Sequence, residues 1–145
     1  IYQKKWNFSR ADDHELVAEI SSGWCMYRLY FTWSENINAI SLSITFDISF
    51  PETKIRNAYE LLGLINENLW LGHFDITSRN GIPAFRHTIL STAETDILHK
   101  KFEDLVDIGI YECEKYYPCF QQVLFDDILP SEAIKLSSFE FIGRA

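Results

Sequence analysis

Between Ala39 and Phe50, apolar and polar side chains alternate without interruption. The apolar set is Ile40, Leu42, Ile44, Phe46, Ile48 and Phe50, and the polar set between them is Ser41, Ser43, Thr45, Asp47 and Ser49. Successive side chains of a β-strand point to opposite faces, so a strand of this pattern has one buried face and one hydrated face. The segment therefore predicts a strand of an antiparallel sheet that is packed on one side, ending at Pro51.

Other segments predict the rest of the sheet. Residues 24–33 are rich in aromatic side chains and predict a second strand, joined to the first by a short polar turn. Its expected core face is Cys25, Tyr27, Leu29, Phe31 and Trp33. Residues 15–20 are interpreted as a strand, although one helical turn is an open alternative. Residues 73–77 and 82–90 flank Asn80-Gly81, the dipeptide most typical of a two-residue hairpin turn.

A helix is expected from Thr53 to Leu71, because apolar side chains recur there at helical spacing, and Gly72 is expected to end it. Its predicted inner face is Ile55, Ala58, Tyr59, Leu62, Ile65, Asn66 and Leu69. We expect the Asn66 amide to satisfy main-chain groups rather than to contact a ligand.

A second helix is expected from Glu94 to Tyr116, before Pro118. It begins at Ser91-x-x-Glu94, which has the form of a capping box, or at an alternative cap, Thr95. Its expected inner face is Leu98, Phe102, Leu105, Gly109 and Tyr116. A last short helix is expected after Pro130, since proline suits a first helical turn.

The order of these elements predicts an α+β fold, in which an antiparallel sheet of hairpins carries helices on one face. A chain of 145 residues is typical of a single domain, here 1–145, with a hydrophobic core that needs no disulfide or metal.

Charge and cysteine content exclude several classes of function. The net charge of −8 disfavours nucleic acid and anionic membranes as partners. No run of 18 apolar residues is present, and no leader peptide is recognisable at Ile1. The odd, sparse set of Cys25, Cys113 and Cys119 predicts reduced thiols and a cytoplasmic protein, without a zinc site.

No catalytic, cofactor-binding or metal-binding residues are expected. The chain lacks the phosphate-loop, dinucleotide-binding, zinc-protease and nucleophile-elbow motifs. The best candidate for acid–base or metal chemistry is His73 with Asp75, two residues apart on one strand, and Arg86 on the partner strand. Two side chains are too few for such a site, so a solvated strand face with one hydrogen-bonded pair is the favoured interpretation.

Residues 65–75 (INENLWLGHFD) resemble the YbjN-domain family in its alphaproteobacterial form. Further matching features follow in order along nearly the whole chain: Trp6-x-Phe8, Asp12-Asp13, Tyr30-x-x-Trp33-x-Glu35, Phe46-Asp47 before Pro51, Phe85-Arg86-His87, and Glu112-Cys113-Glu114-x-x-Tyr117-Pro118-x-Phe120-Gln121. The chain departs from the family pattern at Leu129, where the family has Ser or Thr before the proline. A helix that precedes Trp6 in the family is expected to be missing or truncated.

This resemblance implies a fold like that of type III secretion chaperones, with a curved antiparallel sheet against helices. It also implies a non-enzymatic regulator of sensory transduction in the bacterial cytoplasm, with a homodimeric state and a protein partner. We therefore predict a protein-binding regulatory or chaperone-like module. The alternative is a small-molecule sensor with a pocket near the helix-to-strand junction, where His73, Asp75 and Arg86 lie. An enzyme that uses His73 or His87 is the third hypothesis.

The predicted partner-binding residues are Trp33, Glu35, Trp70, His73, Phe74 and Arg86. Trp70, His73 and Phe74 belong to the helix-to-strand junction, and Trp33 and Glu35 to a hairpin tip. If the two groups cluster, they form an aromatic patch with a polar rim that suits a protein partner. The alternative is that the aromatic side chains close the core at the ends of the sheet.

Overall fold

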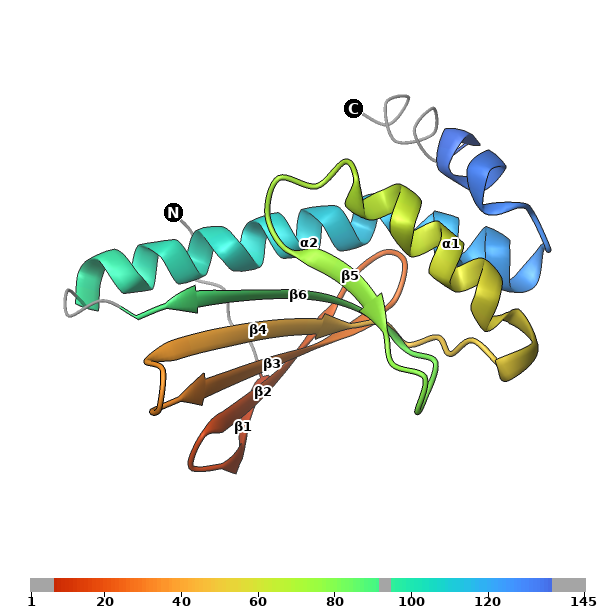
Figure 1. Ribbon diagram of the computed structural model, residues 1–145. Coiled ribbons are helices and arrows are strands. Elements are labelled where there is room, and N and C mark those ends of the chain that lie inside the picture. The colour runs from red at the N-terminus through yellow and green to blue at the C-terminus, as the bar shows by residue number, and fades with distance from the viewer. Residues whose placement is uncertain (1–6, 92–94, 137–145) are drawn as a thin grey trace.

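The computed structural model describes residues 7–91 and 95–136, which form a six-stranded antiparallel sheet and its helices (Figure 1). The strands are β1 Asn7–Asp12, β2 Glu15–Ser21, β3 Met26–Ser34, β4 Ala39–Thr45, β5 His73–Ile76 and β6 Pro83–Leu90. The helices are η1 Glu52–Lys54, α1 Ile55–Asn66 and α2 Thr95–Phe125, followed by a helical segment at 130–136. The strand order is β1-β2-β3-β4-β6-β5, and every pair is antiparallel. The predicted α+β class is confirmed.

Helices α1 and α2 lie on the same face of the sheet, and the core fills the space between these layers (Figure 1). Helix α2 packs on β4 and β6, while α1 packs against β5 and α2. The predicted core face of residues 24–33 is confirmed for Cys25, Tyr27, Leu29 and Phe31, which are buried, and Trp33 is half-buried.

The alternating segment is buried as predicted, but regular pairing ends early. Leu42, Ile44, Phe46 and Phe50 are buried, yet β4 stops at Thr45. The reason lies in the partner strand, since β6 begins at Pro83, which has no N–H to donate. Beyond that point the Phe46 N–H donates to the Pro83 carbonyl (3.0 Å) and the Phe50 N–H to that of Gly81 (2.8 Å).

Helix α1 ends at Asn66, five residues before the predicted boundary, so the prediction that Gly72 ends it is wrong. Gly72 instead has φ +67° just before β5, and a Cβ there would lie 2.5 Å from the Phe85 ring. The predicted inner face is also partly wrong, because Tyr59 is 44% exposed and Leu61 is buried in its place. Ala58, Leu61, Leu62 and Ile65 form the buried stripe, at spacings of three and four residues.

Helix α2 continues through Pro118 to Phe125, so the predicted end before Pro118 is wrong. An interior proline costs a helix about 3 kcal/mol. The last turns of α2 offset this cost by burying Tyr117, Cys119, Phe120, Val123 and Leu124. The predicted capping box includes residues 92–94, which lie outside the described residues, as does the side chain of Leu98. Phe102, Leu105, Gly109 and Tyr116 face the core as predicted, and the helix after Pro130 is confirmed.

Candidate functional site

The second face of the sheet is covered by none of the described helices (Figure 1). Register places these side chains on it: Glu15, Val17, Glu19, Met26, Arg28, Tyr30, Thr32, Ser41, Ser43, Thr45, His73, Asp75, Ala84, Arg86 and Thr88. The polar residues of the alternating sequence therefore face solvent, as antiparallel sheets with one packed face require.

A groove of about 520 Å³ runs over β4 on this open face. Its floor is the row of small side chains Ser41, Ser43 and Thr45, together with Ala84. Larger side chains on the flanking strands form its walls, with Tyr30 on β3 and Arg86 on β6. The groove exists because small residues on one strand lie between long residues on its two neighbours.

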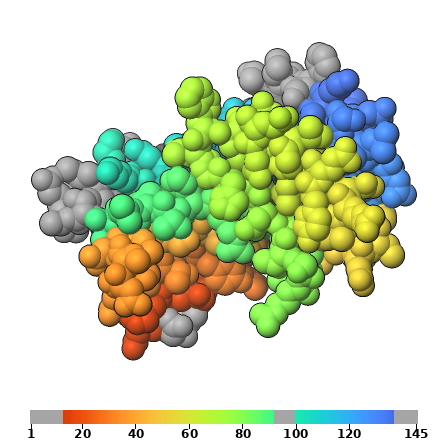
Figure 2. Space-filling model, viewed as in Figure 1, coloured from red at the N-terminus to blue at the C-terminus, as the bar shows by residue number. Residues whose placement is uncertain are grey.

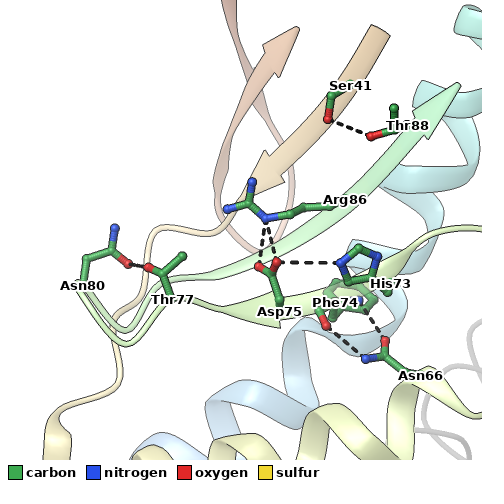
Figure 3. Close-up of polar contacts among 9 residues, drawn as sticks. All are labelled: Ser41, Asn66, His73, Phe74, Asp75, Thr77, Asn80, Arg86 and Thr88. Atoms are coloured by element: carbon green, nitrogen blue, oxygen red, sulfur yellow. Dashed lines mark hydrogen bonds and ion pairs between the residues drawn. The ribbon is translucent and has the colours of Figure 1, made fainter. Parts of the chain in front are cut away.

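Arg86 forms an ion pair with Asp75 across β5 and β6 (Figure 3). Arg86 Nε lies 2.9 Å from Asp75 Oδ1 and 2.8 Å from Oδ2, and His73 Nε2 lies 3.7 Å from Oδ2. All three side chains are part-exposed. The favoured interpretation of this trio, a solvated strand face with one hydrogen-bonded pair, agrees with this geometry. Among the side chains that the structure describes, no three His, Cys, Asp or Glu residues are grouped to hold a metal ion.

Ser43 differs from the other hydroxyl residues of the open face. It is only 8% exposed, and its side chain has no hydrogen-bond partner among the described residues. In the register of the sheet it lies between Tyr30 on β3 and Arg86 on β6. Two residues away along β4, the Ser41 hydroxyl accepts a hydrogen bond from that of Thr88 (3.2 Å). No signal within the β4 sequence distinguishes Ser43 from Ser41, because the difference comes from the neighbouring strands.

The connection from α1 to β5 presents an exposed tryptophan. Trp70 is 100% exposed and Leu71 is 38% exposed. In Figure 2 this yellow-green segment stands out from the surface of the molecule. The adjoining Phe74 is 1% exposed and packs against the rings of Phe46, Phe85, Tyr116 and Phe120. The junction therefore combines a core anchor with an outward-facing indole.

Asn66 holds the start of β5 against the end of α1 (Figure 3). The Phe74 N–H donates to Asn66 Oδ1 at 2.8 Å, and Asn66 Nδ2 donates to the Phe74 carbonyl at 3.0 Å. This confirms the prediction that the Asn66 amide satisfies main-chain groups.

The structure does not bring all six predicted partner-binding residues together. Trp33 lies on the helix-covered face, with its ring edge-to-face with His14 at 6.1 Å, and Glu35 is exposed in the β3–β4 turn. His73 and Arg86 lie on the open face, and Phe74 is in the core. The proposed single patch therefore does not form, because the pleat sends Trp33 and Arg86 to opposite faces.

Hydrogen bonds between polar groups also tie α2 to the sheet. The Tyr27 hydroxyl donates to Glu114 Oε2 (2.7 Å), the Ser22 hydroxyl donates to the same oxygen (3.2 Å), and the Tyr117 hydroxyl donates to Asp47 Oδ1 (2.9 Å). Burial, aided by the charge of Asp47, raises the pKa of the Cys25 thiol to about 12. Burial also holds the pKa of Cys113 well above its usual range. Both groups are thus neutral thiols near pH 7 rather than nucleophiles.

A family model matches residues 2–122, and its description reads "YbjN: Putative bacterial sensory transduction regulator". The chain belongs to the YbjN family. The resemblance noted in the sequence is thereby confirmed. No curated protein and no solved structure matches the chain.

The YbjN match spans the whole sheet and most of α2, so the groove and the α1–β5 connection both lie inside the family domain. The helical segment at 130–136 lies beyond the match. None of the helices described for this YbjN chain is both long enough and apolar enough to cross a membrane. The family description names a regulatory role for YbjN members, and it names no reaction.

Proposed function

We propose that this YbjN domain is a non-enzymatic regulator of the bacterial cytoplasm that binds a partner protein through Trp70 and the rest of the α1–β5 connection. The observation that carries the proposal is the complete exposure of Trp70 on a segment whose two ends are held in place. Asn66 fixes one end to Phe74, and close packing of Gly72 against Phe85 fixes the other.

An indole presented in this way is suited to a protein interface. Tryptophan buries about 150–250 Å² and is enriched among the residues that dominate binding energy. Because the backbone around Trp70 is already positioned, a partner would order little besides the side chain itself. Leu71 extends the apolar surface next to it.

The test is capture of partner proteins from a lysate of the source bacterium, with wild-type protein and two variants compared at equal concentration. Trp70→Ala is expected to lose a specific partner, with affinity weakened by about 2 kcal/mol, roughly thirtyfold. Tyr111→Ala, at an exposed aromatic on α2, is the matched control and is expected to retain that partner. Capture that is equal for all three proteins would reject the proposal.

Homodimerisation, which the family resemblance suggests, is a separate part of the proposal. Light scattering on the purified chain measures it directly. A dimer that Trp70→Ala converts to a monomer would identify the second copy as the partner. A dimer that survives this substitution would leave the Trp70 surface available for a different protein.

A second candidate, a small-molecule sensor, is favoured by the groove over β4. Its volume of about 520 Å³ falls in the usual range for ligand sites, about 300–1,000 Å³. This alternative predicted a pocket near the helix-to-strand junction, but the groove lies over β4 instead. Of His73, Asp75 and Arg86, only Arg86 lines it. A thermal-shift screen of metabolites tests this candidate, and a screen without a stabilising ligand would count against it.

A further inference from the structure

We propose that the groove over β4 binds the carboxylate or phosphate group of a small molecule, held by the guanidinium of Arg86 and the hydroxyl of Ser43. The proposal deepens the second candidate function above and rests on it, because it assigns a ligand class and two anchoring groups to the same groove.

The orientation of Arg86 is the first observation. Asp75 contacts the guanidinium through Nε alone, so the two terminal nitrogens are left over (Figure 3). They point away from Asp75 and across β4, and among the described residues they have no hydrogen-bond partner. A planar guanidinium presents paired N–H groups that match the two oxygens of a carboxylate or phosphate. The ion pair with Asp75 thus fixes the side chain in a conformation ready to receive an oxyanion.

The unpaired hydroxyl of Ser43 is the second, independent observation. At 8% exposure the side chain is more than nine-tenths buried, and it lines the groove directly across from Arg86. Among the described residues the fully buried side-chain oxygen without a partner is Gln122 Oε1, so the Ser43 hydroxyl is open to the groove and available to a ligand. A ligand oxygen held by Arg86 would lie where Ser43 can donate to it. Arg86 and Ser43 are register partners on the same face and both line the groove, so both can donate to one ligand group.

The charges around the groove limit the ligand to a small molecule. Glu15 and Asp47 lie toward opposite ends of the groove, and Arg28 on its wall is paired with Glu19 at 3.1 Å. These acidic groups and the chain charge of −8 repel a long polyanion such as nucleic acid. A single oxyanion on a compact molecule can reach Arg86 without approaching the acidic ends. The small floor residues leave room for the rest of that molecule.

The experiment is an NMR titration of the whole chain, followed through the Arg86 side-chain N–H and the Ser43 amide. Inorganic phosphate and succinate are titrated separately, so that the two arms distinguish phosphate from carboxylate recognition. We expect saturable shifts at both positions with at least one probe. Ser43→Ala and Arg86→Lys are each expected to weaken binding about tenfold or more, the usual effect of losing a hydrogen bond to a charged group.

Two controls separate binding from folding and from nonspecific attraction. Ser43→Ala removes a hydroxyl that lines the groove and bonds no other described residue, so its melting temperature should stay close to that of the wild type while its affinity falls. Arg56→Ala removes an exposed arginine of α1 and should leave affinity unchanged. The inference is overturned if neither probe shifts these resonances, or if Arg56→Ala weakens binding as much as Arg86→Lys. A stabilising ligand of another chemical class would then preserve the sensor function without this assignment.

Discussion

The side-chain amide of Asn66 forms two hydrogen bonds, and both are to the main chain of a single residue, Phe74. Because β5 is the last strand of the sheet, these main-chain groups point away from β6, toward the side where a further strand would pair. Asn66 thus substitutes for one residue of a neighbouring strand. Asn66 is the last residue of α1, and its side chain protects the edge of the sheet.

Substitution of Asn66 by Ala is expected to lower the free energy of unfolding by about 2–3 kcal/mol, since two part-buried main-chain groups lose their partner. Asn66→Asp should fall between this variant and the wild type, because a carboxylate can accept from the Phe74 N–H but cannot donate. Urea denaturation measures the difference. Asn68→Ala is the control, since that amide is exposed, and a loss as large as that of Asn66→Ala would contradict the interpretation.

Two helix glycines should respond to alanine in opposite directions. A Cβ at Gly109 would lie 2.7 Å from Ile44 Cδ1 and 3.1 Å from the Phe85 ring, whereas a Cβ at Gly63 meets nothing within 4 Å. Gly63→Ala should stabilise the protein by about 0.5–1 kcal/mol through helix propensity. At Gly109 the same gain in helix propensity is opposed by overpacking, which costs about 1–3 kcal/mol. Gly109→Ala should therefore destabilise the protein. If denaturant melts showed the same change in the free energy of unfolding for Gly63→Ala and Gly109→Ala, then α2 would not lie this close to the sheet.

Replacing Pro118 by Ala is expected to raise the free energy of unfolding by about 1–3 kcal/mol, because α2 is continuous there and proline denies the Glu114 carbonyl its helical partner. The control is Pro130→Ala, at the first position of a helical segment, where proline costs little. Thermal or urea melts of the two variants check this. A destabilised Pro118→Ala protein would indicate that the proline shapes a bend the fold requires.

Stability should fall as the pH rises above about 9. The pKa of the Cys25 thiol is raised from 9.0 to about 12 in the folded protein, so the thiol ionises first in the unfolded chain. Its contribution to stability is complete below pH 9 and is lost as the pH approaches 12. Urea melts between pH 7 and 10.5 measure this slope, which Cys25→Ala should make shallower. An unchanged slope in that variant would assign the effect to other groups, such as Tyr116, whose pKa burial raises to about 12.

The sequence predicted those parts of the fold that depend on local pattern. The alternation after Ala39, the Asn80-Gly81 turn and the main-chain role of Asn66 follow from side-chain period, turn chemistry and amide hydrogen bonding. The end of α1 was predicted too late, because the main chain after Asn66 continues in turns, with Asn68 N–H bonded to the Ile65 carbonyl and Leu69 N–H to that of Asn66. The spacing of apolar side chains does not distinguish such turns from the helix. The continuation of α2 through Pro118 depends on tertiary burial that outweighs a local preference against proline.

The candidate sites were harder to predict for the same reason. Placing Trp33 with Trp70 and Arg86 required knowing which face of the sheet each residue occupies and which strands are neighbours. Ser43 acquires its special position only because β6 pairs with β4, a pairing between segments about forty residues apart in the chain. Neither segment contains a sequence feature that predicts this strand pairing.

Insertion of β6 between β4 and β5 also has a consequence for how the molecule is built during synthesis. Strands β1 to β4 form a meander of neighbouring hairpins that can assemble while the rest of the chain is still on the ribosome. Until β6 arrives, the outer edge of β4 is open and the groove has only one wall. A ligand of this groove would therefore bind the completed sheet more tightly than that partly folded form. Its binding would indicate that the chain had been synthesised beyond residue 90, the end of β6.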